Sequence, residues 1–190
     1  AGGADGRAAQ GAAESFVAVA LAYQPSFQAY KQRYPEVSFN RLITLALTDT
    51  MARAFFGAFP PLAQEYGVYL SACTLLPKLV TSEEAEDIEV FGDPGIDDEG
   101  SVYIAAGPEV YNVCYLWGPD GAEIGASRKV NLVALEGPEM LDLAAESLDK
   151  VVAYDLPFGR VGIAISLDAF KPDYVGHLND LGAEIVLQND

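Results

Sequence analysis

Reactive side chains stand where two predicted strands end. Lys129 lies at the end of one strand, and Glu136 follows seven residues later in a segment rich in turn-forming residues. Ser166 lies at the tip of a second, buried strand, with Asp168 close by and a predicted helix soon after. Strand ends open onto the pocket in α/β folds. A nucleophile at a strand-to-helix turn also lies near backbone N–H groups that can receive an oxyanion. Ser166 is therefore the candidate nucleophile, and Asp168 is read as an acid that complements a helix dipole.

The elements that must position these residues are predicted as two hairpins followed by a helix and a strand. Strands are predicted over 101–106, 109–117, 122–130, 151–156, 161–167 and 183–188, and a helix over 170–181. Residues 118–121 (GPDG) form a strong hairpin turn because proline fixes φ and glycine accepts a positive φ. Hairpins imply antiparallel pairing, and the strand–helix–strand unit implies a mixed sheet layered with helices.

The N-terminal part is predicted to be mainly helical. An alanine-rich helix is predicted over 5–24 with a break at Pro25, although the apolar run 16–22 could equally form a buried strand. Apolar residues recur at helical spacing over 38–66, where Pro60 and Pro61 predict a division into two helices. Residues 67–73 are typical of a buried strand.

A combined sequence pattern extends over segments 110–112, 118–121, 124–125, 128–132, 155–162, 163–168, 172–173 and 181–187. In these segments the chain resembles the nitrilase, or carbon–nitrogen hydrolase, superfamily. Each segment is weak by itself, whereas their joint order and spacing are specific, and the match extends loosely over 40–80. It implies an α-β-β-α sandwich, a mixed β-sheet layered with helices, that pairs with a second copy as a homodimer.

The resemblance also implies a hydrolase that acts on a non-peptide C–N bond of a small amide, nitrile or carbamoyl compound. In that family a cysteine attacks, a lysine stabilises the oxyanion and a glutamate acts as general acid and base, with no metal and no organic cofactor. Lys129 matches the lysine and Glu136 looks like a second glutamate that orients the site. The cysteine position is occupied by Ser166.

This serine is a large chemical departure from the family pattern. A thiol has a reference pKa near 8.5, whereas a hydroxyl must lose its proton to a well-placed base as it attacks. Ser166 is an engineered trap, a natural loss of activity or a working serine variant, and the sequence does not choose among them. The second hypothesis is therefore a catalytically inactive binding or scaffold protein of the same fold.

The family's first glutamate has no convincing match. It follows a proline after an early apolar strand, and Pro35-Glu36 supplies the dipeptide, but the preceding residues 29–33 are too polar for a buried strand. We expect that strand to lie upstream of Ala1 or to be lost, and later strands to follow Asp190. The chain is then a single domain over 1–190, incomplete at both ends.

Charge limits the expected partners. The 190 residues include 28 Asp and Glu against 11 Lys and Arg, a net charge of −17, which repels polyphosphates and anionic membranes. We therefore expect no nucleic acid and no membrane partner. Many of the acids lie in 82–100, which is predicted as a solvated surface loop, with a calcium site or an acidic docking loop as alternatives.

Cysteine and histidine content gives no metal centre. Cys73, Cys114 and His177 are too few for a four-ligand zinc site, and two thiols do not make a disulfide framework. Both cysteines are predicted to lie in core strands. The apolar stretches are too short for a transmembrane helix, and a cytoplasmic, reducing setting is the expected location.

Overall fold

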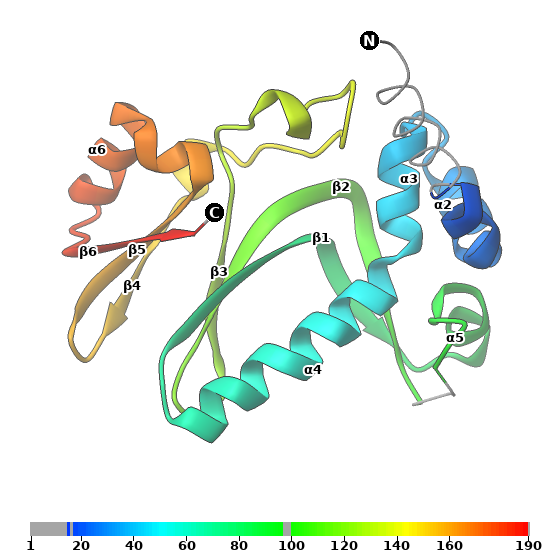
Figure 1. The fold of residues 1–190 in the computed structure, drawn as a ribbon, viewed down its shortest axis with the longest axis horizontal. Helices are drawn as coiled ribbons and strands as arrows, with labels where there is room; N and C mark the ends of the chain where they lie inside the picture. Colours follow the sequence, from blue (N-terminus) through cyan, green and yellow to red (C-terminus); the bar gives the residue numbers. More distant parts are fainter. Residues whose placement is uncertain (1–14, 16, 97–99, 190) are drawn as a thin grey trace, which may run out of the picture.

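The computed structural model describes residue 15, residues 17–96 and residues 100–189, which form two three-stranded sheets with helices around them (Figure 1). The helices are α2 (Gln24–Arg33), α3 (Phe39–Ala46), α4 (Thr48–Tyr66), α5 (Ala85–Phe91) and α6 (Pro172–Asp180). The strands are β1 (Leu70–Ser82), β2 (Val102–Trp117), β3 (Glu123–Arg128), β4 (Ala153–Leu156), β5 (Gly159–Ile165) and β6 (Ile185–Asn189). Short 3₁₀ turns are η1 (Ala134–Glu136), η2 (Leu148–Lys150) and η3 (Ser166–Phe170).

Each sheet is built from strands that follow one another along the chain. In the first sheet β1, β2 and β3 pair antiparallel in that order. In the second sheet β4 and β5 form an antiparallel hairpin, and β6 joins β5 in parallel after α6. Both predicted hairpins and the mixed sheet are therefore confirmed. The strands predicted over 101–106 and 109–117 are one continuous strand, β2.

Alternating side chains of β2 face two different layers, as expected for a pleated strand. One face packs against Phe55 of α4 and consists of Tyr111, Val113, Tyr115 and Trp117. The other face carries Cys114 and Leu116, which pack on Ile163 and Ile165 of β5. Tyr174 and Leu178 of α6 pack with Ala164 on the far side of β5. The layers therefore run α4, first sheet, second sheet, α6, which is the predicted α-β-β-α sandwich (Figure 1).

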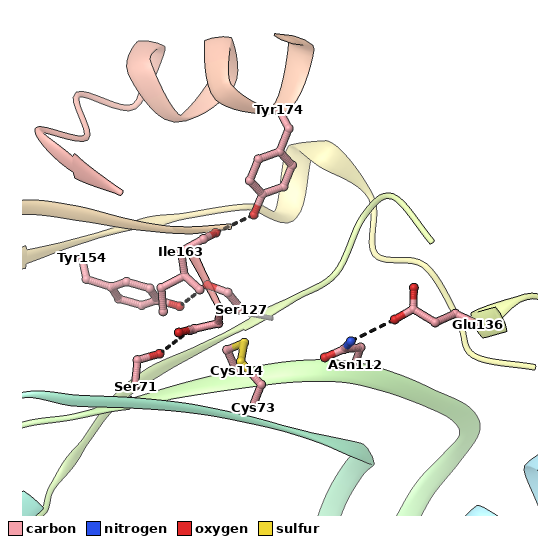
Figure 2. Close-up of a disulfide and its surroundings, with 10 residues drawn as sticks. Ser71, Cys73, Asn112, Cys114, Ser127, Glu136, Tyr154, Ile163 and Tyr174 are labelled. Atoms are coloured by element: carbon pink, nitrogen blue, oxygen red, sulfur yellow. Dashed lines mark hydrogen bonds between the residues drawn. A yellow bond between two sulfur atoms is a disulfide. The ribbon is translucent and has the colours of Figure 1, made fainter. Parts of the chain in front are cut away.

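Polar contacts as well as apolar ones cross the seam between the sheets (Figure 2). Ser127 of β3 and Tyr154 of β4 share a hydrogen bond of 3.0 Å, and the Asn189 amide donates to the Ser71 hydroxyl at 2.8 Å. Gly125 lies under Tyr154, because a Cβ there would be 2.5 Å from the Cε1 atom of that ring. The seam is thus closed by specific fits that a larger residue would disturb.

A disulfide joins the two cysteines at this seam (Figure 2). Cys73 of β1 and Cys114 of β2 are directly opposite each other in the antiparallel register, and Cys114 is fully buried. Both lie in core strands as predicted, but their pairing was not expected. The two residues are 41 positions apart in the sequence, and no local pattern indicates that the strand register places them opposite each other. Disulfides are rare in reducing compartments, and the cytoplasmic location stays a prediction.

The helix boundaries in the N-terminal half differ from those predicted. α4 continues through Pro60 and Pro61, and the break falls at Leu47, where α3 and α4 meet at 51°. The prolines remove N–H donors for the carbonyls four residues earlier, but one of these belongs to exposed Gly57, where water can replace the donor. Residues 17–22 are helical, so the strand alternative for 16–22 is wrong over 17–22, and residues 5–14 and 16 lie outside the described residues.

The structure also differs from the predicted helix break at Pro25 and from the predicted surface loop over 82–100. Pro25 lies in the first turn of α2, where a missing N–H costs nothing, instead of ending a helix. Residues 85–91 of the expected acidic loop form α5, whose Phe91 is buried against Tyr30 with ring centroids 4.9 Å apart. Residues 97–99 lie outside the described part. Among the described residues, no cluster of three or more His, Cys, Asp or Glu side chains is arranged to hold a metal ion.

None of the described helices reaches alone the length and apolar character that a membrane span requires. α3 and α4 meet those criteria of length and composition together, as a bent pair.

Candidate functional site

Lys129 is a buried cation at the end of β3. Its backbone N–H donates to the Asn112 carbonyl at 2.9 Å, which continues the pairing with β2 one residue beyond the strand. Its side chain is only 2% exposed, and its ammonium lies 2.7 Å from Oε2 of Glu136. The ammonium can donate three hydrogen bonds, so donors remain beyond the one that this carboxylate accepts.

Glu136 is held in place by donors from three directions. η1 brings it back toward the sheet, where Oε1 accepts from the Asn112 amide at 2.9 Å (Figure 2). Oε2 accepts from the Val133 N–H at 2.9 Å. Burial alone would raise the pKa of this carboxyl group. Its hydrogen bonds and the positive charge of Lys129 outweigh burial, so the pKa of Glu136 lies below its usual value. An ionised carboxylate with both oxygens engaged is suited to orienting Lys129 and poorly suited to taking a proton.

Ser166 has the backbone conformation of a residue at a sharp turn. It follows β5 directly and is the first residue of η3. Its φ of 48° lies in the left-handed region, which residues other than glycine rarely adopt. Such a conformation costs about 1–3 kcal/mol and is found preferentially at functional sites. Ser166 is partly exposed, and its hydroxyl forms no hydrogen bond to another described residue. The side chain is thus presented at the end of the strand with its oxygen available.

Asp168 connects the turn of Ser166 to the strand end of Lys129. It is fully buried and accepts hydrogen bonds from the Val130 N–H at 3.2 Å, the Asn131 N–H at 2.7 Å and the Asn131 amide at 2.8 Å. Its carboxylate is thus bonded to the residues that follow β3, while Asp168 also lies in the first turn of η3, and its role as an acid that complements a helix dipole stays a prediction. An acid inside an otherwise apolar turn was the signal in the sequence that could have pointed to this contact.

Other carboxylates near these segments are engaged elsewhere. Glu36 is exposed in the turn between α2 and α3, in agreement with its rejection from the sequence. Glu146 donates its backbone N–H to the Lys129 carbonyl at 2.9 Å, but its side chain pairs with Arg128 at 3.6 Å. Across residues 17–96 and 100–189 no carboxylate hydrogen-bonds to the Ser166 hydroxyl, and Glu136 is the one paired with Lys129. A base for a hydroxyl nucleophile is not supplied by these contacts.

Comparisons with known proteins show which fold this is. No family model matches the sequence, and no curated protein matches it. A solved mutant of an amidase of the nitrilase superfamily from Nesterenkonia AN1, with cysteine changed to alanine, aligns with a TM-score of 0.53 and 16% identity over 90% of this chain and 57% of that chain. A carbon-nitrogen hydrolase from Helicobacter pylori G27 aligns with a TM-score of 0.51 and 16% identity over 74% of this chain and 38% of that chain.

The same Nesterenkonia amidase is also solved with acrylamide. A double mutant in complex with acrylamide aligns with a TM-score of 0.51 and 13% identity over 90% of this chain and 57% of that chain. The chain therefore has the fold of the nitrilase superfamily, as the sequence resemblance implied, and spans 38–57% of the length of these neighbours.

Proposed function

Because the chain has the nitrilase-superfamily fold, we propose that it hydrolyses a non-peptide C–N bond in a small amide, nitrile or carbamoyl compound. One observation carries the proposal. Lys129 forms a buried ion pair with Glu136, and the chain directly after Lys129 hydrogen-bonds to Asp168. Asp168 lies in the same turn as Ser166, so the segment that carries the ammonium is hydrogen-bonded to the segment that carries the hydroxyl. An amidase-like reaction needs a nucleophile and an oxyanion-stabilising donor close to each other, and the contact of Asp168 with the chain after Lys129 supports that arrangement.

The roles follow from the chemistry of each group. As Ser166 Oγ bonds to the carbon of an amide, the C=O double bond opens to an oxyanion, to which the ammonium of Lys129 donates. The C–N bond then breaks, the nitrogen leaves with a proton passed through water, and a second water hydrolyses the resulting serine ester to the acid. Glu136 holds that ammonium in place and remains ionised, because its pKa is lowered by its donors. The proton of the Ser166 hydroxyl has no well-suited acceptor among the contacts described above, so turnover with serine is expected to be slow.

The acrylamide complex supports a small amide as the substrate class. Another solved form of the Nesterenkonia amidase shows acrylamide added to its active-site cysteine. That chemistry belongs to the neighbour, and in this chain the sequence resemblance puts Ser166 at the cysteine position. A thiol at position 166 would carry its own nucleophilic thiolate and need less help from a base.

An inactive binding protein of the same fold is the second candidate. It is favoured by one observation: no carboxylate among the described residues hydrogen-bonds to the hydroxyl of Ser166, the residue that the sequence resemblance puts at the cysteine position. Such a protein would keep the fold and the Lys129–Glu136 pair but would bind a small amide without breaking it.

The Ser166→Cys variant separates the two candidates. Ammonia release from acrylamide, propionamide and related small amides should be about 100-fold or more faster than in the parent, in line with the cost of replacing a member of a catalytic set. Adding Lys129→Gln should remove the gain. Ser147→Cys, which puts a thiol at an exposed serine, is the control and should gain nothing. A folded Ser166→Cys variant without turnover supports the binding protein and contradicts the hydrolase.

A further inference from the structure

Asp168 is a buried carboxylate that is satisfied by backbone and amide groups. It is 0% exposed, and within the described residues its side chain forms no ion pair. Burying a carboxylate is costly unless donors replace its water. The donors here come from Val130 and Asn131, the two residues that follow Lys129. The cost of burial is therefore offset by a contact with one particular segment.

This contact joins parts of the molecule that strand pairing leaves independent. Lys129 follows β3 in the first sheet, whereas Ser166 follows β5 in the second, and no ladder of backbone hydrogen bonds connects the two sheets. The distance between their side chains is thus not set by the register of either sheet. Asp168 lies in the same 3₁₀ turn as Ser166, two residues later, and binds the chain directly after Lys129.

The geometry points to Asp168 as a positioning residue that fixes the ammonium of Lys129 relative to the oxygen of Ser166. This inference rests on the proposed function, because it assumes that these two groups act on one substrate. A reaction of this kind is sensitive to placement, since a shift of about 1 Å can cost on the order of 100-fold in rate. Asp168 would then affect catalysis without touching the substrate.

A thiol placed at position 166 can report this distance directly. In the Ser166→Cys variant, the rate of alkylation by iodoacetamide as a function of pH gives the pKa of the introduced thiol. A nearby ammonium lowers a thiol pKa below its usual value near 8.5. Cys73 and Cys114 are bonded to each other, so the introduced thiol is the one that reacts.

Adding Asp168→Asn gives opposite results for a positioning role and for a purely electrostatic one. Asparagine keeps the shape but turns an N–H₂ group toward backbone N–H donors, so the chain after Lys129 should move away. The thiol pKa should then rise by about one unit, because the ammonium recedes. If Asp168 acted only through its negative charge, removing that charge would lower the thiol pKa. A lowered or unchanged value in a folded variant overturns the inference.

Two further variants complete the test. Asn131→Ala, also in the Ser166→Cys background, removes one of the three donors and should raise the thiol pKa by a smaller amount. Asp173→Asn removes an exposed acid in the first turn of α6 and should leave the thiol pKa nearly unchanged. Circular dichroism checks the fold, and if neither Asp168→Asn nor Asn131→Ala folds, Asp168 serves the fold and the positioning role is rejected.

The titration does not depend on finding a substrate. If no amide is hydrolysed but the thiol pKa rises as described, the proposed hydrolysis fails while the positioning role stands. If amides are hydrolysed with kcat unchanged by Asp168→Asn, the hydrolase stands and the positioning role fails. If the protein is a hydrolase and Asp168 is a positioning residue, Asp168→Asn should lower kcat about 10-fold or more with little change in KM, because Asp168 does not contact the substrate.

Discussion

The ammonium of Lys129 lies 2.7 Å from the carboxylate of Glu136, and their side chains are 2% and 7% exposed. Removing two such charges from water costs about as much as their attraction returns, so a buried pair is weak evidence for stability. Breaking the pair on one side is costly, however, because a single charge is then left buried. The pair is better explained by what an oriented ammonium can do for a substrate than by what it adds to the fold.

Replacing one partner of this pair should strongly destabilise the protein. Glu136→Gln leaves the buried ammonium of Lys129 without its counter-charge and should lower the free energy of unfolding by about 3 kcal/mol, as measured by urea denaturation. Asp155→Asn is the control, because Asp155 pairs with Arg160 at 3.2 Å on the surface and should change little. A loss below about 1 kcal/mol for Glu136→Gln would mean that the pair is solvated.

The pH dependence of stability should carry the signature of Glu136. Its pKa in the folded protein is below the ordinary 4.5, so its contribution is complete above that pH and is lost as pH falls through the folded-state pKa. The gap in unfolding free energy between the parent and Glu136→Gln should therefore shrink from pH 7 to pH 3. A gap that stays constant over this range would show that the lowered pKa is absent.

Glycine at position 166 should stabilise the chain. A φ of 48° strains serine but not glycine, and relief of that strain should exceed the entropy cost of glycine by about 0.5–1 kcal/mol. Ser147 has a φ of −82°, so Ser147→Gly should lower stability instead. Melting temperatures of the two variants test this, and a lower value for Ser166→Gly than for the parent would refute the strain.

Reduction of the disulfide should lower stability. Closing a loop between residues 41 apart restricts the unfolded chain by about 2–4 kcal/mol. Cys73→Ala and Cys114→Ala should melt lower than the parent, and a reducing agent should lower the parent's melting temperature while leaving the variants unaffected. Two titratable thiols in the unreduced, denatured protein would show that the bond is not formed.

The close fit between Gly125 and Tyr154 should make position 125 sensitive to an added side chain. In Gly125→Ala the new Cβ would lie 2.5 Å from Cε1 of Tyr154, so the ring must shift, at a cost of about 1–3 kcal/mol. Gly57→Ala in α4 meets no atom within 4 Å and should stabilise by about 0.5–1 kcal/mol. Equal effects of the two changes on urea denaturation would contradict the close approach.

The second half of the fold could be predicted because its signals are local. The turn at 118–121 and the apolar alternation beside it specify a hairpin without reference to the rest of the chain. The helix break was misplaced because a proline pair is disruptive by itself, whereas exposed Gly57 and the packing of α4 on the sheet make it tolerable.

The candidate residues of the site could be named from the sequence, but their contacts could not. Lys129, Glu136 and Ser166 were chosen from the ends of predicted strands and from the resemblance, and the structure pairs the first two. The contact of Asp168 with Asn131 and the bond between Cys73 and Cys114 depend on how strands distant in sequence come to lie together. No local sequence pattern specifies which distant strands lie side by side, so these two contacts could be identified only from the three-dimensional structure.

The strand order has a consequence for how the molecule assembles. Each sheet joins strands that are neighbours along the chain, so each can form with short loop closures and without waiting for the other. Lys129 follows a strand of the first sheet and Ser166 follows a strand of the second, so the contact of Asp168 with Val130 and Asn131 forms when the two halves dock. The proposed site is therefore expected to form last during folding, after both halves have acquired their native hydrogen bonds.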